Sequence, residues 1–243
     1  MIYNVGALLT IFFRIGAGTG GATKSILREL DEAFASYTYT DISAGFFEKA
    51  KQVFKARESK MIYKTLDIEK DVIDQGYEEH SYDLIIASLV LHATSKLDET
   101  MSNVRRLLKP GGYLLLLEIT DNEQMRFGFI FGGLPGWWLG HEDGRPLSPC
   151  IEVPKWDNLL KAHGFSGVDS VAPHKTSEPL PLCVILGQAV DDRIDFLRDP
   201  LASTEEGFNL ADITLIGGAT AATSGCLSAI TSTMQPRSNT ITR

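Results

Sequence analysis

A group of glycines marks the first stretch of this chain that could bind a ligand. Residues 11–15 form an apolar run, which is followed by four glycines and then by an amphipathic helical pattern. The glycines are Gly16, Gly18, Gly20 and Gly21. Because they have no Cβ, the backbone can come close to a ligand, and the first N–H groups of the following helix are unpaired. The pattern predicts a nucleotide-type site on a strand–turn–helix unit.

The glycines alone leave the identity of the ligand open. Gly16, Gly18 and Gly21 satisfy the dinucleotide fingerprint G-x-G-x-x-G, and Asp41 lies 20 residues past Gly21, where such folds keep a ribose-binding acid. A nicotinamide dinucleotide, S-adenosylmethionine and a structural turn without a ligand are all compatible with these residues.

Further polar residues stand where other apolar segments end. Asp41, Asp67, Ser88 and Glu118 each close a strand-like segment, and His92 follows Ser88 closely. Because parallel strands end at the same edge of a sheet, these residues are expected to converge on one crevice. An imidazole held by a carboxylate can act as a general base, since the acid accepts the second ring N–H and fixes the tautomer. Each acid alone could instead cap a helix or a turn.

Hydrophobic periodicity defines the elements that position these residues. Runs of β-branched, aromatic or leucine-rich sequence predict strands at 11–15, 36–41, 61–66, 82–87 and 113–119. Helical spacing predicts helices at 22–30, 46–54, 97–108 and 153–163, the third with a capping box at Ser95 and Asp98 and a stop at 109–112. An antiparallel strand pair is expected at 167–172 and 180–189. The alternation predicts a doubly wound α/β fold with a mostly parallel seven-stranded sheet and an antiparallel closing strand.

Two segments depart from this alternation. Residues 121–154 are aromatic and glycine-rich, then polar and turn-rich, which suits a lid or substrate-facing wall, or aromatics plugged into the edge of the core. We expect one domain over residues 1–190. Residues 191–243 are expected to form a charged linker and a lone strand at 211–218, with disorder from about residue 235.

Composition excludes several classes of function. The 243 residues carry a formal net charge of −8, which argues against a non-specific nucleic-acid or anionic-membrane surface. The three cysteines are far apart, so the sequence shows neither a zinc motif nor a disulfide framework, and no metal is expected. The apolar run at 5–13 is too short to span a bilayer and lacks a basic signal-peptide region. We therefore expect a cytoplasmic protein.

The later motifs distinguish between the cofactors. A short-chain nicotinamide reductase should carry a Tyr-x-x-x-Lys pair, and no tyrosine here has a lysine four residues later. Residues 81–94 and 107–118 instead resemble the fourth and fifth motifs of class I methyltransferases. With the glycine loop, Asp41 and the pair Asp67 and Ile68, the resemblance covers roughly residues 11–190 and implies a Rossmann-like methyltransferase fold.

Four further segments sharpen this resemblance. Residues 15–23, 134–140, 144–149 and 164–169 together resemble the C-methyltransferase domain of fungal highly reducing polyketide synthases. The resemblance implies methylation of the α-carbon of a β-ketoacyl thioester carried on an acyl carrier protein, with other polyketide synthase domains as partners. Residues 213–218 resemble the start of the pseudo-ketoreductase region that follows in that family, so the chain is expected to be a fragment or a shortened product.

The resemblance also assigns site residues. It implies that His92 is the general base and that Glu118 orients it. The residues implied to bind S-adenosylmethionine are Gly16, Ala17, Gly18, Gly20, Asp41, Ile42, Asp67, Ile68 and Ser88. Among these, Asp41 would accept the ribose hydroxyls, Asp67 would accept the adenine amine, and Ile68 would pack on the ring. Trp137, Trp138 and Arg145 are implied to line the acyl or pantetheine channel.

Two departures from the family pattern keep other functions open. Arg14 stands where class I methyltransferases usually carry an acid that helps to hold the methionine ammonium, so it is expected either to point elsewhere or to mark a damaged site. The family also has a helical lid before the glycine loop, and only ten residues precede residue 11 here. The alternatives are a free-standing small-molecule methyltransferase and an inactive methyltransferase-fold scaffold.

Overall fold

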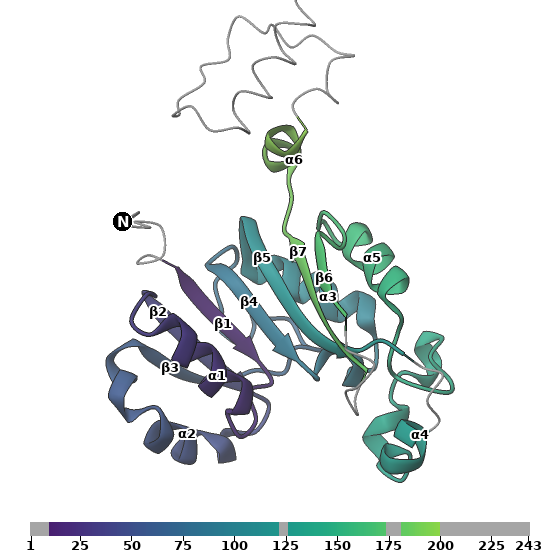
Figure 1. The fold of residues 1–243 in the computed structure, drawn as a ribbon, viewed down its shortest axis with the longest axis horizontal. Coiled ribbons are helices and arrows are strands. Elements are labelled where there is room, and N and C mark those ends of the chain that lie inside the picture. Colours follow the sequence, from purple (N-terminus) through teal and green to yellow (C-terminus); the bar gives the residue numbers. More distant parts are fainter. Residues whose placement is uncertain (1–9, 122–125, 174–180, 200–243) are drawn as a thin grey trace, which may run out of the picture. The chain divides into compact units, whose positions relative to one another are not determined.

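The computed structural model describes residues 10–121, 126–173 and 181–199. Seven strands form one sheet in the order β3-β2-β1-β4-β5-β7-β6 (Figure 1). Their bounds are β1 Ile11–Ile15, β2 Ser36–Asp41, β3 Met61–Thr65, β4 Tyr82–Ser88, β5 Leu108–Ile119, β6 Ser170–Ala172 and β7 Leu182–Gln188. The strands β1 to β5 pair in parallel, while β7 is antiparallel to both β5 and β6. This confirms the predicted mixed, doubly wound sheet.

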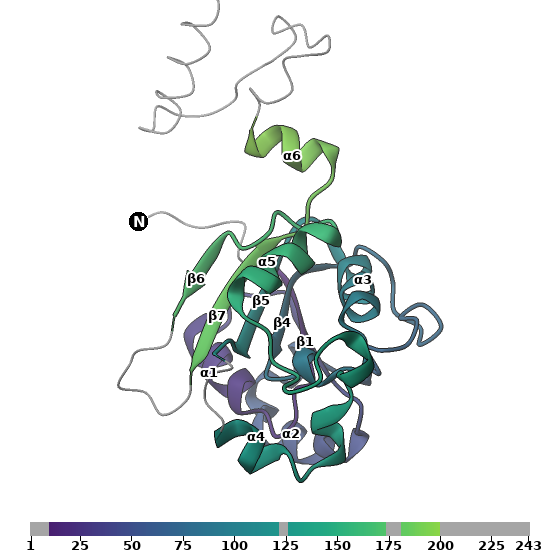
Figure 2. The ribbon, with the colours of Figure 1, turned by 90° about the vertical axis from the view of Figure 1, so that its right-hand side faces the viewer.

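The described ranges also contain six α-helices and several short 3-10 turns, which lie between these strands except for α6, the helix after β7 (Figure 2). The helices are α1 Gly21–Leu30, α2 Phe47–Val53, α3 Leu97–Leu107, α4 Arg126–Phe131, α5 Val153–Ala162 and α6 Asp192–Arg198. The 3-10 turns are η2 Ala44–Phe46, η3 Lys55–Lys60, η4 Leu91–Ala93, η5 Pro135–Trp138 and η6 His141–Asp143. The turn η4 and the segment from α4 to η6 matter most, because they surround the histidine predicted to be catalytic.

Two hydrophobic layers hold the sheet between its helices. On one face, Phe13, Ile85 and Leu114 pack against α3 and α5, whose Met101 and Trp156 are fully buried. The opposite face is packed by a second, aromatic-rich cluster under α1 and α2, composed of Phe12, Ala17, Leu27, Phe34, Tyr37, Tyr39, Phe47, Ala50, Phe54, Met61 and Ile86. Alternate residues of β1 belong to the two clusters, as expected for a strand that is buried on both faces.

The sheet order fixes where a ligand would bind. The chain continues from β1 toward β2 on one side and later returns to β4 on the other side, so the order reverses between β1 and β4. In open α/β sheets, ligands bind beyond the carboxyl ends of the strands at such a switch point. The glycine loop after β1 and the residues after β4 therefore border the expected crevice.

Two local expectations were wrong. The Ser95 hydroxyl hydrogen-bonds Glu69 and does not cap α3, whose N-cap is Lys96. Helix α3 ends at Leu107, just before residues 109–112 as expected, but the strand expected at 113–119 already begins at Leu108, and its register with β4 shifts between Tyr82 and Leu84. The charged segment expected to be a linker begins as helix α6, because the Asp191 side chain accepts the first helical N–H groups. The strand expected at 211–218 lies outside the described residues.

Candidate active site

The glycine loop adopts a backbone conformation that glycine favours. Gly16 and Gly18 have φ values of +57° and +54°. A Cβ at Gly16 would lie 2.5 Å from a methyl group of Val90, so a larger residue cannot fit there without movement. A Cβ at Gly18 would meet nothing within 4 Å. The space beside the Gly18 Cα is therefore open, so a ligand can approach the loop closely there.

Asp41 fastens this loop to the end of β2. One carboxylate oxygen accepts the Gly18 N–H at 2.8 Å, and the other accepts the Ser43 N–H at 3.0 Å. The Tyr39 hydroxyl also donates to Gly18 O at 2.7 Å. Asp41 is only 7% exposed, whereas the neighbouring Ile42 is 71% exposed. Each carboxylate oxygen has a further lone pair that can accept a ribose hydroxyl, and this contact of Asp41 stays a prediction.

Arg14 points into the end of the sheet at the switch point. Nη1 donates to Ile15 O at 2.8 Å and to Ile86 O at 3.1 Å, and Nε has no hydrogen-bond partner. The residue is 3% exposed, and this burial lowers the pKa of the guanidinium. The guanidinium is thus turned toward main-chain carbonyls at the ends of β1 and β4, and the alternative that Arg14 marks a damaged cofactor site stays a prediction. A buried cation therefore lies under the loop that would hold the cofactor.

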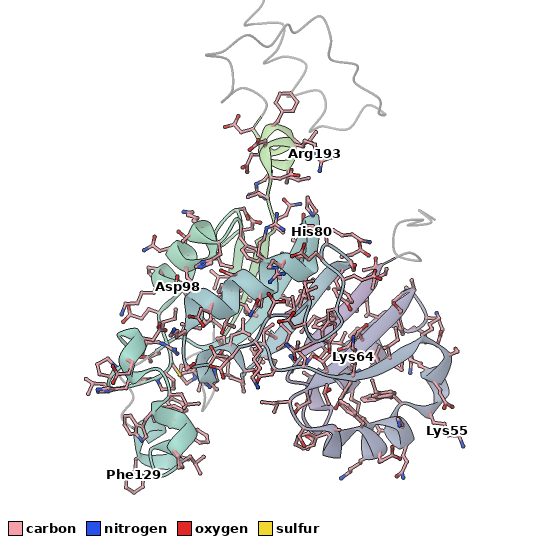
Figure 3. All side chains as sticks on the ribbon, turned by 180° about the vertical axis from the view of Figure 1, so that it is seen from behind. Lys55, Lys64, His80, Asp98, Phe129 and Arg193 are labelled. Atoms are coloured by element: carbon pink, nitrogen blue, oxygen red, sulfur yellow. The ribbon has the colours of Figure 1, made fainter. Side chains whose placement is uncertain are left out.

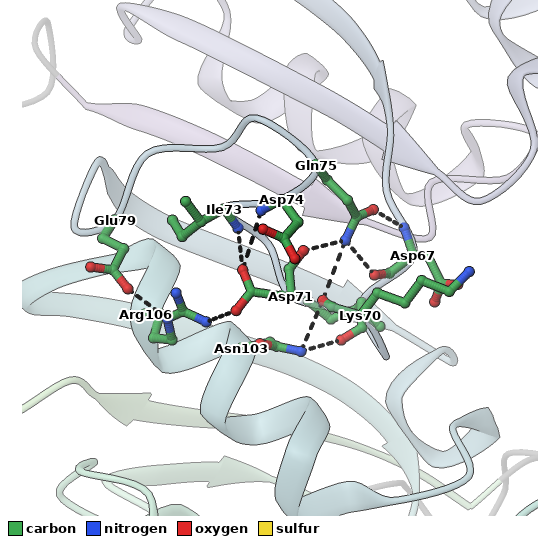
Figure 4. Close-up of polar contacts among 10 residues, drawn as sticks. Asp67, Lys70, Asp71, Ile73, Asp74, Gln75, Glu79, Asn103 and Arg106 are labelled. Carbon is green, nitrogen blue, oxygen red and sulfur yellow. Dashed lines mark hydrogen bonds and ion pairs between the residues drawn. The ribbon is translucent and has the colours of Figure 1, made fainter.

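The loop after β3 carries Asp67 and Ile68 and is held by side-chain amides (Figure 4). Gln75 accepts the Asp67 N–H at 2.8 Å and donates back to Asp67 O at 2.9 Å. Asn103, on α3, donates to Ile68 O at 2.9 Å. The Asp67 carboxylate pairs with Lys70 at 2.9 Å, and Ile68 is 6% exposed within the core. The predicted adenine contacts of Asp67 and Ile68 remain predictions, and Ser88 lies half-buried at the end of β4.

His92 and Glu118 form a hydrogen-bonded pair between η4 and the end of β5. Nδ1 of His92 lies 2.6 Å from one carboxylate oxygen of Glu118, and the other oxygen accepts the Leu91 N–H at 3.2 Å. The Glu118 side chain is fully buried and the His92 side chain is 12% exposed. Both carboxylate oxygens are therefore engaged, and the acid fixes the orientation of the imidazole. Nε2 is left as the ring nitrogen that a substrate can reach.

The imidazole opens into an apolar pocket. This pocket has a volume of about 410 Å³ and is lined by Leu89, His92, Ala93, Ile119, Phe131, Leu134, Gly136, Trp137, Leu139 and Pro149. Trp137 is 8% exposed and stacks on Phe131 with ring centroids 5.4 Å apart. A larger hollow of about 720 Å³ shares Ile119 and is bordered by Trp138 and Arg145. The two tryptophans thus line different hollows that share Ile119.

The structure brings some of the predicted residues together and separates others. Asp41 accepts the Gly18 N–H, His92 is hydrogen-bonded to Glu118, and His92 and Trp137 line the same pocket. Arg145 does not share that pocket, because its guanidinium donates to main-chain oxygens of His92, Thr94 and Ser95. Sequence reasoning missed Gln75, Asn103 and Asp143. The two amides donate to backbone carbonyls and Asp143 accepts a backbone N–H, and such contacts with the backbone leave no spacing pattern. The described residues include no group of three or more histidine, cysteine or acidic side chains placed to bind a metal. Among the described helices, none is both long and apolar enough to cross a membrane.

Comparison with known proteins agrees with this geometry. Residues 13–114 match the family described as a methyltransferase domain. A polyketide synthase-nonribosomal peptide synthetase of Aspergillus clavatus is 58% identical over 223 residues, which cover 92% of this chain and 6% of that protein. A second one, from Pyricularia oryzae, is 62% identical over 206 residues, which cover 84% of this chain and 5% of that protein.

Solved structures show the same relationship. The trans-methyltransferase CalH, crystallised with SAH, has a TM-score of 0.71 at 41% identity, covering 76% of this chain and 52% of that chain. The CMeT domain of the citrinin polyketide synthase has a TM-score of 0.62 at 30% identity, covering 75% of this chain and 47% of that chain. Residues 13–114 therefore match a methyltransferase domain, and the sheet has the Rossmann-like fold of its S-adenosylmethionine-dependent structural neighbours. The chain is similar to the carbon-methyltransferase domains of polyketide synthases, and it spans about a twentieth of the length of the curated fungal relatives it matches.

Proposed function

We propose that this chain catalyses S-adenosylmethionine-dependent methylation of the α-carbon of a β-ketoacyl thioester during polyketide synthesis. The observation that carries the proposal is the His92–Glu118 pair, whose imidazole lines an apolar pocket next to the switch point of the sheet. A carrier-protein thioester as substrate and other polyketide synthase domains as partners are part of the same proposal. They are supported by the likeness to fungal synthases.

The glycine loop fits the proposed cofactor. Gly18 faces open space, and the Asp41 carboxylate lies beside it at the end of β2. We assign the loop glycines and Asp41 to the methionine and ribose parts, with Ala17, Ile42, Asp67, Ile68 and Ser88 along the remaining surface. When bound, S-adenosylmethionine supplies an electrophilic methyl group.

The chain's own residues supply the base. A hydrogen between a ketone and a thioester is acidic enough for removal by an imidazole, and general-base catalysis contributes about 10²–10⁴-fold. In the proposed step, Nε2 of His92 takes this proton, and the electron pair of the C–H bond stays on the substrate as the carbon nucleophile. The buried Glu118 carboxylate stabilises the resulting imidazolium through Nδ1. The proton then leaves Nε2 to solvent after the product departs.

The pocket around His92 suits an acyl chain. Its walls are mainly apolar, and Trp137 and Leu139 close one side. We assign Trp137 to the acyl chain and Trp138 to the pantetheine arm, because Trp138 borders the neighbouring hollow. Exclusion of water by these walls would strengthen the interaction between the imidazolium and Glu118.

The test is methyl transfer to a diketide thioester mimic by the purified chain. We expect a product that carries the new methyl group on carbon, shown by NMR, and loss of about 10²–10⁴-fold in rate for His92→Ala. His141→Ala is the matched control, because His141 is exposed in the same region of the chain and should leave the rate unchanged. Methylation on oxygen, or full activity of His92→Ala, would refute the proposal.

One observation favours a second candidate, an inactive methyltransferase-fold scaffold. Arg14 places a buried cation under the cofactor loop, and the cofactor carries a positive sulfonium. Calorimetric titration with S-adenosylmethionine separates the two candidates. Binding supports the enzyme, and absence of binding in a folded protein supports the scaffold.

A further inference from the structure

The guanidinium of Arg145 is buried beneath the turn that carries His92. Arg145 is 7% exposed. Its Nη1 donates to His92 O at 2.8 Å and Pro149 O at 3.1 Å, and its Nη2 donates to Thr94 O at 2.7 Å and Ser95 O at 3.2 Å. Nε donates to the Asp143 carboxylate at 3.0 Å. A guanidinium has five N–H groups, so each of them has an acceptor within the protein and none is left for a substrate.

We propose that Arg145 is a positioning residue for His92, an inference that rests on the proposed role of His92 as the base. The imidazole of His92 is held by Glu118, and the main-chain carbonyl of the same residue is held by Arg145. The turn η4 is a single 3-10 turn, so its own hydrogen bonds cannot fix it firmly. The two attachments together set both the direction and the depth of Nε2 in the pocket.

Arg145 also links this turn to a second residue that lines the pocket. Pro149, which accepts from Nη1, lines the same pocket as His92. The partner of Arg145, Asp143, accepts the Leu97 N–H at 3.1 Å and so holds the start of α3 as well. One buried ion pair therefore fixes the base, the wall and the helix relative to one another. In general, a displacement of about 1 Å at a reacting group can cost about 100-fold in rate.

Gly140 offers a second way to disturb the guanidinium. A Cβ at Gly140 would lie 2.5 Å from Cζ of Arg145, because the guanidinium packs directly against the backbone there. Gly140→Ala would thus displace the guanidinium while leaving its charge and its donors in place. The variant therefore tests the effect of moving the Arg145 guanidinium without removing it.

The experiment compares Arg145→Met, Arg145→Lys and Gly140→Ala with a matched control, Arg105→Met. Arg105 also donates to three main-chain carbonyls, those of Gly164, Leu108 and Val190, and all three lie outside the His92 turn. Two readouts are measured on the full chain. One is the ¹⁵N NMR signals of the histidine ring nitrogens, which report the tautomer and environment of His92 without any substrate. The other is the kcat and KM for the diketide thioester, followed across pH.

A positioning role predicts a specific pattern. The His92 ring signals shift in Arg145→Met and Gly140→Ala and stay unchanged in Arg105→Met. We expect kcat to fall by about 10–100-fold in Arg145→Met with KM changed less than about threefold. Arg145→Lys should recover only part of the loss, because an ammonium has three donors and lacks the planar fork.

Unchanged His92 signals in both Arg145→Met and Gly140→Ala would overturn the inference, as would a raised KM with kcat retained, which indicates substrate contact. If Arg145→Met does not fold, Gly140→Ala decides. Failure of the proposed function looks different, because an inactive native chain can still show shifted His92 signals in these variants. In that case the positioning contact stands and the catalytic assignment does not.

Discussion

Glu118→Gln is the substitution that tests the His92–Glu118 pair most directly. The side chains have nearly the same shape, so the fully buried site keeps its packing. A glutamine cannot form both hydrogen bonds that the Glu118 carboxylate accepts. One carboxylate oxygen accepts the Leu91 N–H and the other accepts from Nδ1 of His92, whereas glutamine has only one acceptor oxygen and one NH₂ group.

Either orientation of the new amide is unfavourable. If NH₂ faces Nδ1, the imidazole must carry its hydrogen on Nε2, and the lone pair that would take the substrate proton is lost. If NH₂ faces the Leu91 N–H, two buried donors meet, which costs about 1–3 kcal/mol. We therefore expect the rate of methyl transfer to fall by about 10²–10⁴-fold, the contribution of a general base, with little change in KM.

Two assays check this expectation. Methyl transfer to the diketide thioester gives kcat and KM, and exchange of the substrate α-hydrogen with D₂O reports proton removal separately. The histidine ring ¹⁵N signals should show Nε2–H in Glu118→Gln and Nδ1–H in the native chain. A Glu118→Gln protein that exchanges the α-hydrogen within about threefold of the native rate would show that the acid does not orient the base.

Three further outcomes follow from other buried groups. Arg14→Met should tighten binding of S-adenosylmethionine by about tenfold or more, because it removes a buried cation beneath the proposed cofactor loop that would repel the sulfonium. SAH, which lacks the sulfonium charge, should gain much less, and equal gains in calorimetry would contradict the argument. Burial raises the pKa of the Cys150 thiol from 9.0 to about 11, so its alkylation at pH 8 should be about 100-fold slower in the folded than in the unfolded chain. The same shift contributes stability below pH 9 that is lost as the pH rises toward 11, and peptide mass spectrometry and thermal unfolding measure the two effects. Trp156→Ala should lower the free energy of unfolding in urea by about 3–5 kcal/mol, because the side chain is fully buried between α5 and the sheet. Phe129→Ala is the control, since Phe129 is 91% exposed on α4 and points outward in Figure 3, and a comparable loss there would contradict the assignment of the core.

The sequence predicted most of the elements because burial leaves a periodic trace. The strand bounds of β1 and β2 agree with the apolar and alternating runs at 11–15 and 36–41. The glycines after β1 marked a turn, and positive φ values at Gly16 and Gly18 bear this out. Charged and surface segments were predicted less well. Helix α6 depends on a single capping side chain, Asp191, and such a local contact has no period.

The sequence likewise predicted only part of the arrangement of the candidate site residues. The order of strands and helices alone indicated that Asp41, His92 and Glu118 would reach one edge of the sheet, because parallel strands end together. The contact at 2.6 Å between His92 and Glu118, however, depends on a register between β4 and β5 that only the folded sheet sets.

Arg14 and Arg145 show what only the tertiary structure decided. Both are arginines near glycine-rich sequence, and nothing in their neighbours along the chain says where the guanidinium points. In the fold, Arg14 lies under the cofactor loop at the switch point, while Arg145 binds the main chain around His92. A long, flexible side chain is directed by the carbonyl groups that the surrounding fold leaves without partners. Apart from Ile15 O and Pro149 O, those carbonyls come from residues 50 or more positions away in the chain, so the sequence carries no local record of them.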